Sequence, residues 1–189
     1  VFIPVAEKIG LINALGEWVL KTACAEAASW ATPLKVSVNV SPIQLMNTSL
    51  TDTIIEVLHQ TGLDPRRLDL EITESDVFNE NTRSLEILSQ LREQGIQISI
   101  DDFGTGYSSL SRLSYFPFDK IKIDRSFVIN IPEQKDDLDI VRLIISMGKS
   151  LHMRIVAEGV ETEEQLASLQ ALGCDLVQGY LIGKPSPLR

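Results

Sequence analysis

The chain has 189 residues, 44% hydrophobic and 23% charged, which is enough apolar material for one folded domain and does not suggest disorder. Its 26 acidic residues outnumber the 17 basic ones, giving a net charge of −9. This balance argues against a surface for polymeric nucleic acid, because phosphate contacts need clustered Lys and Arg. An anionic substrate would therefore need a cation.

Helical patterns occupy much of the chain. The predicted helices cover residues 4–9, 11–30, 50–61, 82–94, 137–151 and 162–172. Glycines end three of them, at Gly62, Gly95 and Gly173. The buried stripe of the second helix is expected to comprise Leu11, Leu15, Trp18, Val19 and Ala23.

Six short strand patterns alternate with most of these helices, which indicates parallel βα units. They cover residues 35–40, 68–73, 96–101, 120–124, 154–158 and 175–178. Apolar and polar residues alternate within them, so that Val36 and Val38 oppose Ser37 and Asn39. A doubly wound sheet would give near-continuous apolar strands, so a β/α barrel with polar side chains inside explains the pattern better.

Six strands fall short of the usual eight of such a barrel. Because the chain opens at Val1 without Met, we expect residues 1–189 to be one partial domain that lacks about two βα units of ~30 residues before Val1.

Cys24 and Cys174 lie far apart in apolar contexts, which is typical of reduced thiols. No apolar run approaches the ~20 residues of a membrane helix. We therefore expect a cytoplasmic domain without direct membrane insertion, within a parent protein that could itself be membrane-anchored.

Asp101 and Asp102 end the third strand and lead into a Gly-rich loop at residues 103–109. A divalent cation would offset the repulsion of two adjacent carboxylates. Asp and Gly are also ordinary turn residues, and the pair taken alone favours a turn. Functional-looking polar residues at the ends of the other strands favour a metal site instead.

Seven short motifs with chemically distinctive residues lie along the chain, most of them at strand ends. They occupy residues 2–7 (Phe-Ile-Pro-Val-Ala-Glu), 39–41 (Asn-Val-Ser), 71–74 (Glu-Ile-Thr-Glu), 101–110 (Asp-Asp-Phe-Gly-Thr-Gly-Tyr-Ser-Ser-Leu), 122–124 (Lys-Ile-Asp), 157–161 (Ala-Glu-Gly-Val-Glu) and 178–180 (Gln-Gly-Tyr). In this order they resemble the EAL-domain phosphodiesterases of bacterial cyclic di-GMP signalling. The resemblance implies an α/β fold, a (β/α)8 TIM-like barrel of the EAL type with one antiparallel strand. Its first two strands would be absent from this chain, including the one whose Glu-Ala-Leu signature supplies a metal ligand.

The resemblance further implies a two-metal site for Mg²⁺ or Mn²⁺. Asn39, Glu71 and Asp101 would join the missing Glu around one ion, and Asp101, Asp102 and Glu158 would hold the second. All of these are oxygen ligands, which hard cations prefer. The implied reaction is hydrolysis of cyclic di-GMP to linear pGpG, in which water attacks phosphorus and the ribose 3′-oxygen leaves.

Lys122, Glu158 and Glu161 are the implied catalytic residues. Lys122 would orient or activate the water, or stabilise phosphoryl charge, although a lysine paired with Asp124 or Glu158 is the plainer alternative. Glu158 could be a metal ligand, a general base or both. For Glu161 the residues alone suggest a helix N-terminal charge, and for Gln178 a buried hydrogen-bonding side chain.

Gln178, Asp124 and Ile182 are the implied substrate contacts. Ile182 stands where the family often has an aromatic residue, and stacking on a base is worth ~1–3 kcal/mol. Glu74 is implied to stabilise the Asp-Asp-Phe-Gly loop through hydrogen bonds, the alternative being an exposed loop acid. That loop is implied to contribute to a homodimer that transmits signals from attached sensory or GGDEF domains.

A second hypothesis is a catalytically inactive EAL domain that binds cyclic di-GMP as a receptor. The unseen Glu separates this receptor from an enzyme, and the fragment alone is expected to be inactive without it. A third hypothesis, an enolase-like barrel, also uses carboxylates and lysine at strand ends. The adjacent Asp pair and the Gly-Thr-Gly loop fit it poorly, so we prefer the phosphodiesterase.

Overall fold

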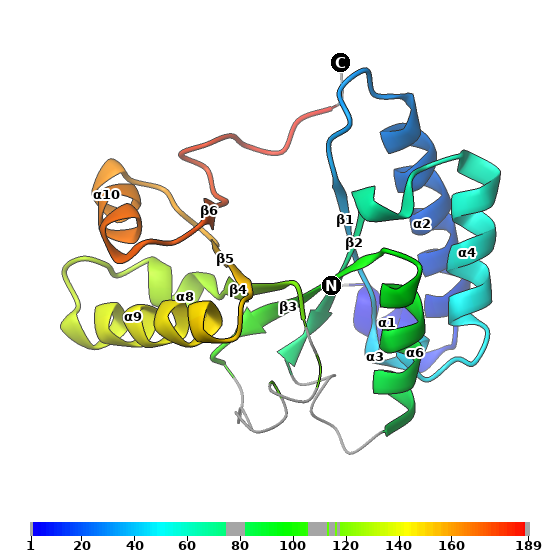
Figure 1. The fold of residues 1–189 in the computed structure, drawn as a ribbon, viewed down its shortest axis with the longest axis horizontal. Coiled ribbons are helices and arrows are strands. Elements are labelled where there is room, and N and C mark those ends of the chain that lie inside the picture. Colours follow the sequence, from blue (N-terminus) through cyan, green and yellow to red (C-terminus); the bar gives the residue numbers. More distant parts are fainter. Residues whose placement is uncertain (1, 75–81, 106–112, 114–115, 117, 188–189) are drawn as a thin grey trace. The chain divides into compact units, whose positions relative to one another are not determined.

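A computed structural model describes residues 2–74, 82–105, 113, 116 and 118–187. Six strands alternate with helices, and the sheet follows the chain in the order β1-β2-β3-β4-β5-β6 (Figure 1). The chain divides into two compact units, residues 1–99 and 100–189. Every helix and strand that the sequence predicts is present, with ends that differ by at most a few residues.

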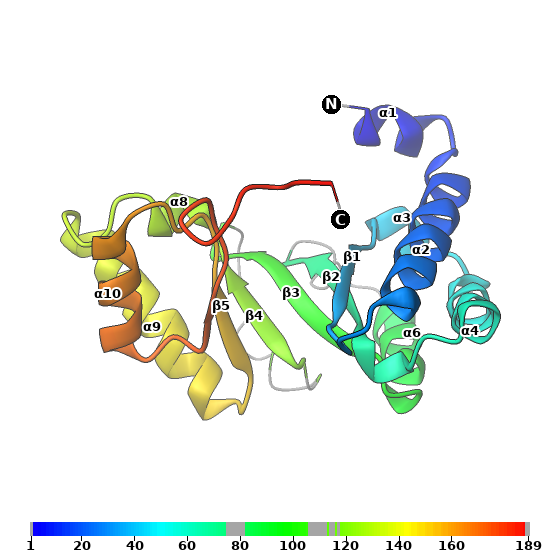
Figure 2. The same cartoon turned by 90° about the horizontal axis from the view of Figure 1, so that it is seen from above.

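In the first unit, helix α2 packs against strand β1 and against helix α4 (Figure 2). Strand β1 pairs in parallel with β2, with Val36 opposite Leu68 and Asn39 opposite Glu71. Strand β3 (Gln97–Phe103) begins in this unit. The other elements of the unit are α1 (Ile3–Lys8), α2 (Ile12–Ser29), β1 (Val36–Asn39), α3 (Pro42–Leu45), α4 (Leu50–Thr61), the 3-10 helix η1 (Pro65–Arg67), β2 (Leu68–Thr73) and α6 (Thr82–Glu93).

Local sequence explains where these helices begin and end. Ser41 starts α3 through a capping box, in which its hydroxyl accepts from the Ile43 amide and Gln44 Oε1 accepts from the Ser41 amide at 3.1 Å. Pro42 suits the first helical position. Gly62 ends α4 in the left-handed region at φ +69°, which glycine adopts without strain.

In the second unit, helix α9 packs on strands β4 and β5. Strands β4 and β5 pair in parallel, with Lys120 opposite Arg154, and β5 pairs in parallel with β6. Gly173 closes α10 at φ +77°, at the position predicted. The elements after β3 are β4 (Lys120–Ile123), α8 (Arg125–Val128), α9 (Lys135–Ser150), β5 (Arg154–Ala157), α10 (Glu163–Leu172) and β6 (Leu176–Val177).

The predicted buried stripe of α2 is wrong at Leu11 and Trp18, and its other members, Leu15, Val19 and Ala23, are only half-buried. Trp18 is 63% exposed and Leu11 is also exposed, whereas the fully buried positions are Ile12, Leu20, Cys24 and Ala27. Apolar residues surround much of this helix, so its periodicity did not single out one face. The contacts with β1 and α4 determine the buried side instead.

Polar and apolar residues alternate along both β1 and β2, but the burial of the polar ones differs between the two strands. In β1, Val38 is buried while Ser37 and Asn39 are exposed. In β2 the polar residues Asp69 and Glu71 are buried along with the apolar ones. Buried polar groups need hydrogen-bond partners, so the side chains of Asp69 and Glu71 must form hydrogen bonds within the protein.

Cys24 and Cys174 are free thiols, as predicted. None of the helices in the described part of the chain combines the length and apolar character needed to cross a membrane.

Candidate functional site

Three carboxylates meet at the ends of strands in the second unit. Asp101 and Asp102 come from the last residues of β3, and Glu158 directly follows β5. One carboxylate oxygen of each lies within 4.8 Å of the others. The prediction placed these three residues together around one ion, and oxygen atoms at this spacing suit Mg²⁺ or Mn²⁺.

Lys122 brings a positive charge into this cluster from strand β4. Its Nζ lies 3.0 Å from Asp101 Oδ1 and 2.8 Å from Glu158 Oε1. The residue is only 5% exposed, so water screens these two ion pairs weakly. The sequence suggested Asp124 or Glu158 as partners of Lys122, and the pairing with Glu158 is confirmed. The pairing with Asp101 was not suggested by the sequence.

Asp102 occupies an unusual backbone position and carries an unfavourable charge. Its φ is +52°, in the left-handed region, which Asp tolerates better than most side chains. Desolvation raises the pKa of its carboxyl group, and the negative charges of Asp101 and Asp124 raise it further. The site therefore carries excess negative charge that a divalent cation would neutralise, so the donor set fits such an ion.

Asp124 and Arg125 follow strand β4. The Asp124 carboxylate caps helix α8, accepting from the Ser126 amide at 3.0 Å and from the Ser126 hydroxyl. Arg125 reaches the turn after β5, where its Nη2 donates to Glu161 Oε1 at 2.8 Å. Sequence reasoning missed Arg125, although it directly follows the Lys-Ile-Asp motif at a strand end.

Glu161 lies one residue before the N-cap of α10, which is Thr162. Its amide donates to Gln165 Oε1 at 2.7 Å, so its backbone is tied to the first turn of the helix. Its carboxylate is paired with Arg125 and is not simply a solvated helix N-terminal charge.

Gln178 holds the turn after β5 through its backbone. The Gln178 amide donates to the Ala157 carbonyl at 2.8 Å, and its carbonyl accepts from the Val160 amide at 3.0 Å. The Gln178 side chain is exposed, so the alternative of a buried hydrogen-bonding side chain is wrong. Ile182, the third implied substrate contact, is 61% exposed and follows the exposed Tyr180.

The remaining predicted site residues belong to the first unit. Asn39 is exposed and lies opposite the buried Glu71 in the β1–β2 register. Glu74 is buried, which contradicts the alternative of an exposed loop acid. Sequence reasoning did not single out Asp69, a buried acid that accepts from Ser99 Oγ at 2.6 Å and from Ser37 Oγ at 3.2 Å. Its position on the polar side of the β2 alternation was the available signal.

Part of the predicted Gly-rich loop, Gly106 to Leu110, lies outside the described residues. Gly104 is described and has φ +101°, a conformation that favours glycine. A Cβ at Gly104 would lie 2.8 Å from Phe127 Cε2, so the start of the loop packs closely on α8.

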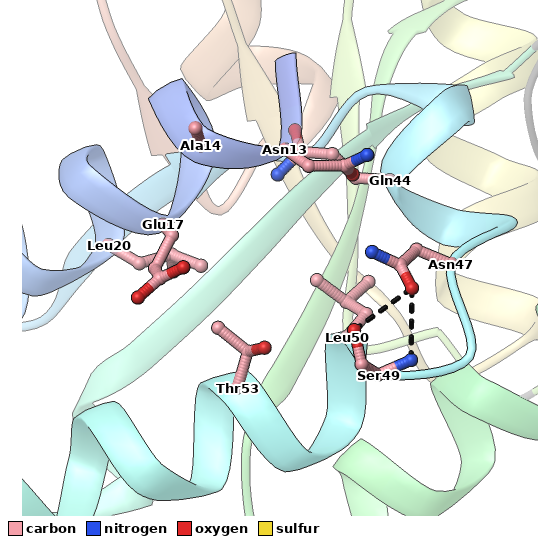
Figure 3. Close-up of a pocket in the computed structure, with 9 residues that line it drawn as sticks. All are labelled: Asn13, Ala14, Glu17, Leu20, Gln44, Asn47, Ser49, Leu50 and Thr53. Carbon is pink, nitrogen blue, oxygen red and sulfur yellow. Dashed lines mark hydrogen bonds between the residues drawn. The ribbon is translucent and has the colours of Figure 1, made fainter. Parts of the chain in front are cut away.

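A separate cavity of about 210 Å³ lies in the first unit among α2, α3 and α4 (Figure 3). Asn13, Glu17 and Gln44 line it, together with Asn47, whose Oδ1 accepts from the amide and hydroxyl of Ser49. The residues predicted for the metal and substrate sites are not among those that line this cavity.

Comparison with known proteins agrees with this geometry. A model of the EAL domain family matches residues 1–185. The bifunctional diguanylate cyclase/cyclic di-GMP phosphodiesterase MucR of Pseudomonas aeruginosa is 45% identical over 98% of this chain and 28% of its own length. The cyclic di-GMP phosphodiesterase NbdA of the same organism is 44% identical over 99% of this chain and 24% of its own length. The chain thus spans about a quarter of these relatives.

A solved complex of the MucR phosphodiesterase with c-di-GMP superposes with a TM-score of 0.94. It is 45% identical, and the match covers 98% of this chain and 77% of the solved one. The six strands with their helices therefore have the TIM-barrel-like fold of EAL domains, as the sequence predicted. With its fold, its strand-end carboxylates and the family match over residues 1–185, the chain belongs to the EAL domain family.

Proposed function

We propose that the protein carrying this chain hydrolyses cyclic di-GMP to linear pGpG in a reaction that depends on divalent cations. The observation that supports this most directly is the cluster of Asp101, Asp102 and Glu158 with Lys122 buried against it. Two relatives that are at least 44% identical are named as cyclic di-GMP phosphodiesterases. Hydrolysis of a phosphodiester can use such a cluster, because the carboxylates can hold divalent cations and the lysine can stabilise phosphoryl charge.

Asp101, Asp102 and Glu158 would hold one Mg²⁺ or Mn²⁺, and Asp101 would share a second ion with Asn39, Glu71 and the Glu of the Glu-Ala-Leu signature. When bound, such ions make water nucleophilic at neutral pH and stabilise both oxygens of an in-line displacement. The carboxylates would hold the ions in place, and neighbouring side chains would handle the protons.

Lys122 supplies the positive charge nearest to the carboxylates. With its Nζ within 3.0 Å of both Asp101 and Glu158, it fixes these two side chains and can direct a proton toward a phosphoryl oxygen. Glu158 can accept a proton from the attacking water while it is held by Lys122. Phosphorus would gain a bond to the water oxygen and lose its bond to the ribose 3′-oxygen.

Exposed residues beside the cluster would bind the dinucleotide. Ile182 presents an apolar surface to a guanine base, and Gln178 presents an amide for hydrogen bonding. The Asp124 carboxylate, one oxygen of which caps α8, would accept a hydrogen bond from the dinucleotide through its other oxygen. We also propose attached sensory or GGDEF domains, since the relatives are far longer than this chain. A cytoplasmic location and a homodimer complete the proposal, both taken from the resemblance to the family.

The test is to incubate the full-length protein with cyclic di-GMP and Mg²⁺ or Mn²⁺ and to separate the nucleotides by chromatography. Linear pGpG should accumulate, and EDTA should stop it. Asp101→Asn should abolish turnover, whereas Asp136→Asn, an exposed acid on α9, should not. Tight binding without product would support the receptor hypothesis, and turnover that survives EDTA would overturn the metal dependence.

A further inference from the structure

We propose that Arg125 is a positioning residue that holds the Glu161 carboxylate at the edge of the site. This inference rests on the proposed function for its kinetic consequences, since the resemblance to EAL domains implies a catalytic role for Glu161 in that reaction. The guanidinium Nη2 lies 2.8 Å from Glu161 Oε1. Arg125 comes from the end of β4 and Glu161 from the turn after β5, so this contact joins two adjacent strand ends.

The stem of Arg125 is as closely placed as its charged end. Gly159 has φ +71°, and a Cβ there would lie 2.2 Å from Arg125 Cγ and 2.8 Å from its Cδ. Another residue at this position would therefore displace the arginine. The absence of a side chain on Gly159 leaves the space in which the Arg125 stem lies across the turn.

The backbone of the same turn is held independently of Arg125. The Val160 amide donates to the Gln178 carbonyl and the Leu181 amide donates to the Val160 carbonyl, both at 3.0 Å. Gln165 accepts from the amides of Glu161 and Thr162 and donates to the Ile129 carbonyl at 3.1 Å. Loss of Arg125 should therefore release the Glu161 side chain and leave the turn in place.

A purely stabilising role would predict little effect of removing Arg125, because ion pairs between exposed side chains contribute little to folding. The Arg125 side chain is 54% exposed. The chain offers a matched control, because Arg142 is also 54% exposed and pairs with Asp139 within helix α9. The two arginines thus differ in whether their partner lies in the proposed site.

The experiment compares Arg125→Met, Arg125→Lys and Arg142→Met in the full-length protein. Arg125→Met keeps an apolar stem over Gly159 and should lower kcat about 10-fold to 100-fold, the loss typical of a misplaced catalytic group. KM should change less than kcat, Tm should stay close to that of Arg142→Met, and Arg125→Lys should recover part of kcat. Wild-type kcat in Arg125→Met, or a kcat loss that Arg142→Met shares, would overturn the inference.

A double-mutant cycle tests the route through Glu161. Adding Arg125→Met to Glu161→Gln should cause little further loss, because the arginine would have no carboxylate left to place. Losses that multiply instead would show that Arg125 acts elsewhere, and would overturn the inference.

A crystal structure of Arg125→Met keeps this inference separate from the proposed function. The Glu161 carboxylate should lose its ordered position while the Val160 backbone hydrogen bonds remain. An unmoved Glu161 would overturn the inference even in an active enzyme. A wild-type protein that produces no pGpG would overturn the proposed function and leave this structural result to decide the positioning role.

Discussion

Gly179→Ala should destabilise the protein and impair the site, because the new methyl group would meet backbone. A Cβ at Gly179 would lie 2.1 Å from the Val160 carbonyl oxygen and 2.3 Å from its nitrogen, whereas ordinary contacts begin at 3.4 Å. A backbone atom cannot rotate away as a side chain can. The two segments must separate by about 1 Å, an estimate from the shortfall in that contact.

The expected loss of stability follows from the contacts that this separation would break. The Val160 amide to Gln178 carbonyl bond and the Leu181 amide to Val160 carbonyl bond would both lengthen beyond 3.0 Å. Each is worth about 1 kcal/mol net, and overpacking typically adds about 1–3 kcal/mol. We expect unfolding to become easier by about 3–5 kcal/mol, together with a loss of turnover because Glu158 and Glu161 flank Val160.

Urea unfolding followed by circular dichroism measures this change, with product formation assayed on the same samples. Gly183→Ala is the matched control, because a Cβ there has nothing within 4 Å. It should alter stability by no more than about 0.5 kcal/mol. If Gly179→Ala unfolds at the same urea concentration as Gly183→Ala, the steric reasoning is refuted.

Three other predictions concern buried charge, pH and thiol reactivity. Lys122→Met should destabilise the metal-free protein by about 3–5 kcal/mol, because two poorly solvated carboxylates lose their shared cation; an unchanged urea midpoint would contradict this. Hydrogen bonds from Arg66 lower the pKa of Asp64 from 3.8 to about 2, so its stabilising contribution is present above pH 4 and lost as pH falls toward 2. Asp64→Asn should remove that part of the acid sensitivity in unfolding curves measured from pH 2 to 6, and identical curves would disprove it. Burial raises the pKa of the Cys24 thiol to about 11 and also raises the pKa of Cys174. Because Cys24 is buried and Cys174 is partly exposed, a disulfide reagent at pH 8 should label Cys174 first; faster labelling of Cys24 would refute this.

The helix and strand positions were predictable because local signals specify them. Gly62 and Gly173 end α4 and α10 at the predicted residues, since the left-handed conformation at a helix end favours glycine. The face of α2 was not predictable in the same way. A helix that is apolar nearly all round carries no directional signal, and the exposure of Trp18 depends on where β1 and α4 pack.

The sequence predicted which residues form the candidate site better than it predicted which of their side chains are in contact. The resemblance to EAL domains implied that Asp101, Asp102 and Glu158 share one ion, and their carboxylates do lie together at strand ends. Arg125 and Glu161 are 36 residues apart in sequence, and their pairing depends on how their side chains meet in the folded chain. No periodicity of the sequence predicts such a contact. The exposure of Gln178 likewise follows from the path of the chain after β5, where its backbone amide and carbonyl bond to Ala157 and Val160 and its side chain faces outward.

The buried carboxylate of Asp69 has a consequence for how the strands align. It accepts hydrogen bonds from Ser37 on β1 and from Ser99 on β3, and it is only 1% exposed. A slip of β2 by one residue would turn Asp69 to the opposite face of the sheet, away from both hydroxyl groups and among apolar side chains. The same slip would remove Glu71 from its place opposite Asn39. Asp69 thus stabilises the native register of β2, so that an acid with no proposed chemical role determines which way Glu71, a proposed metal ligand, points.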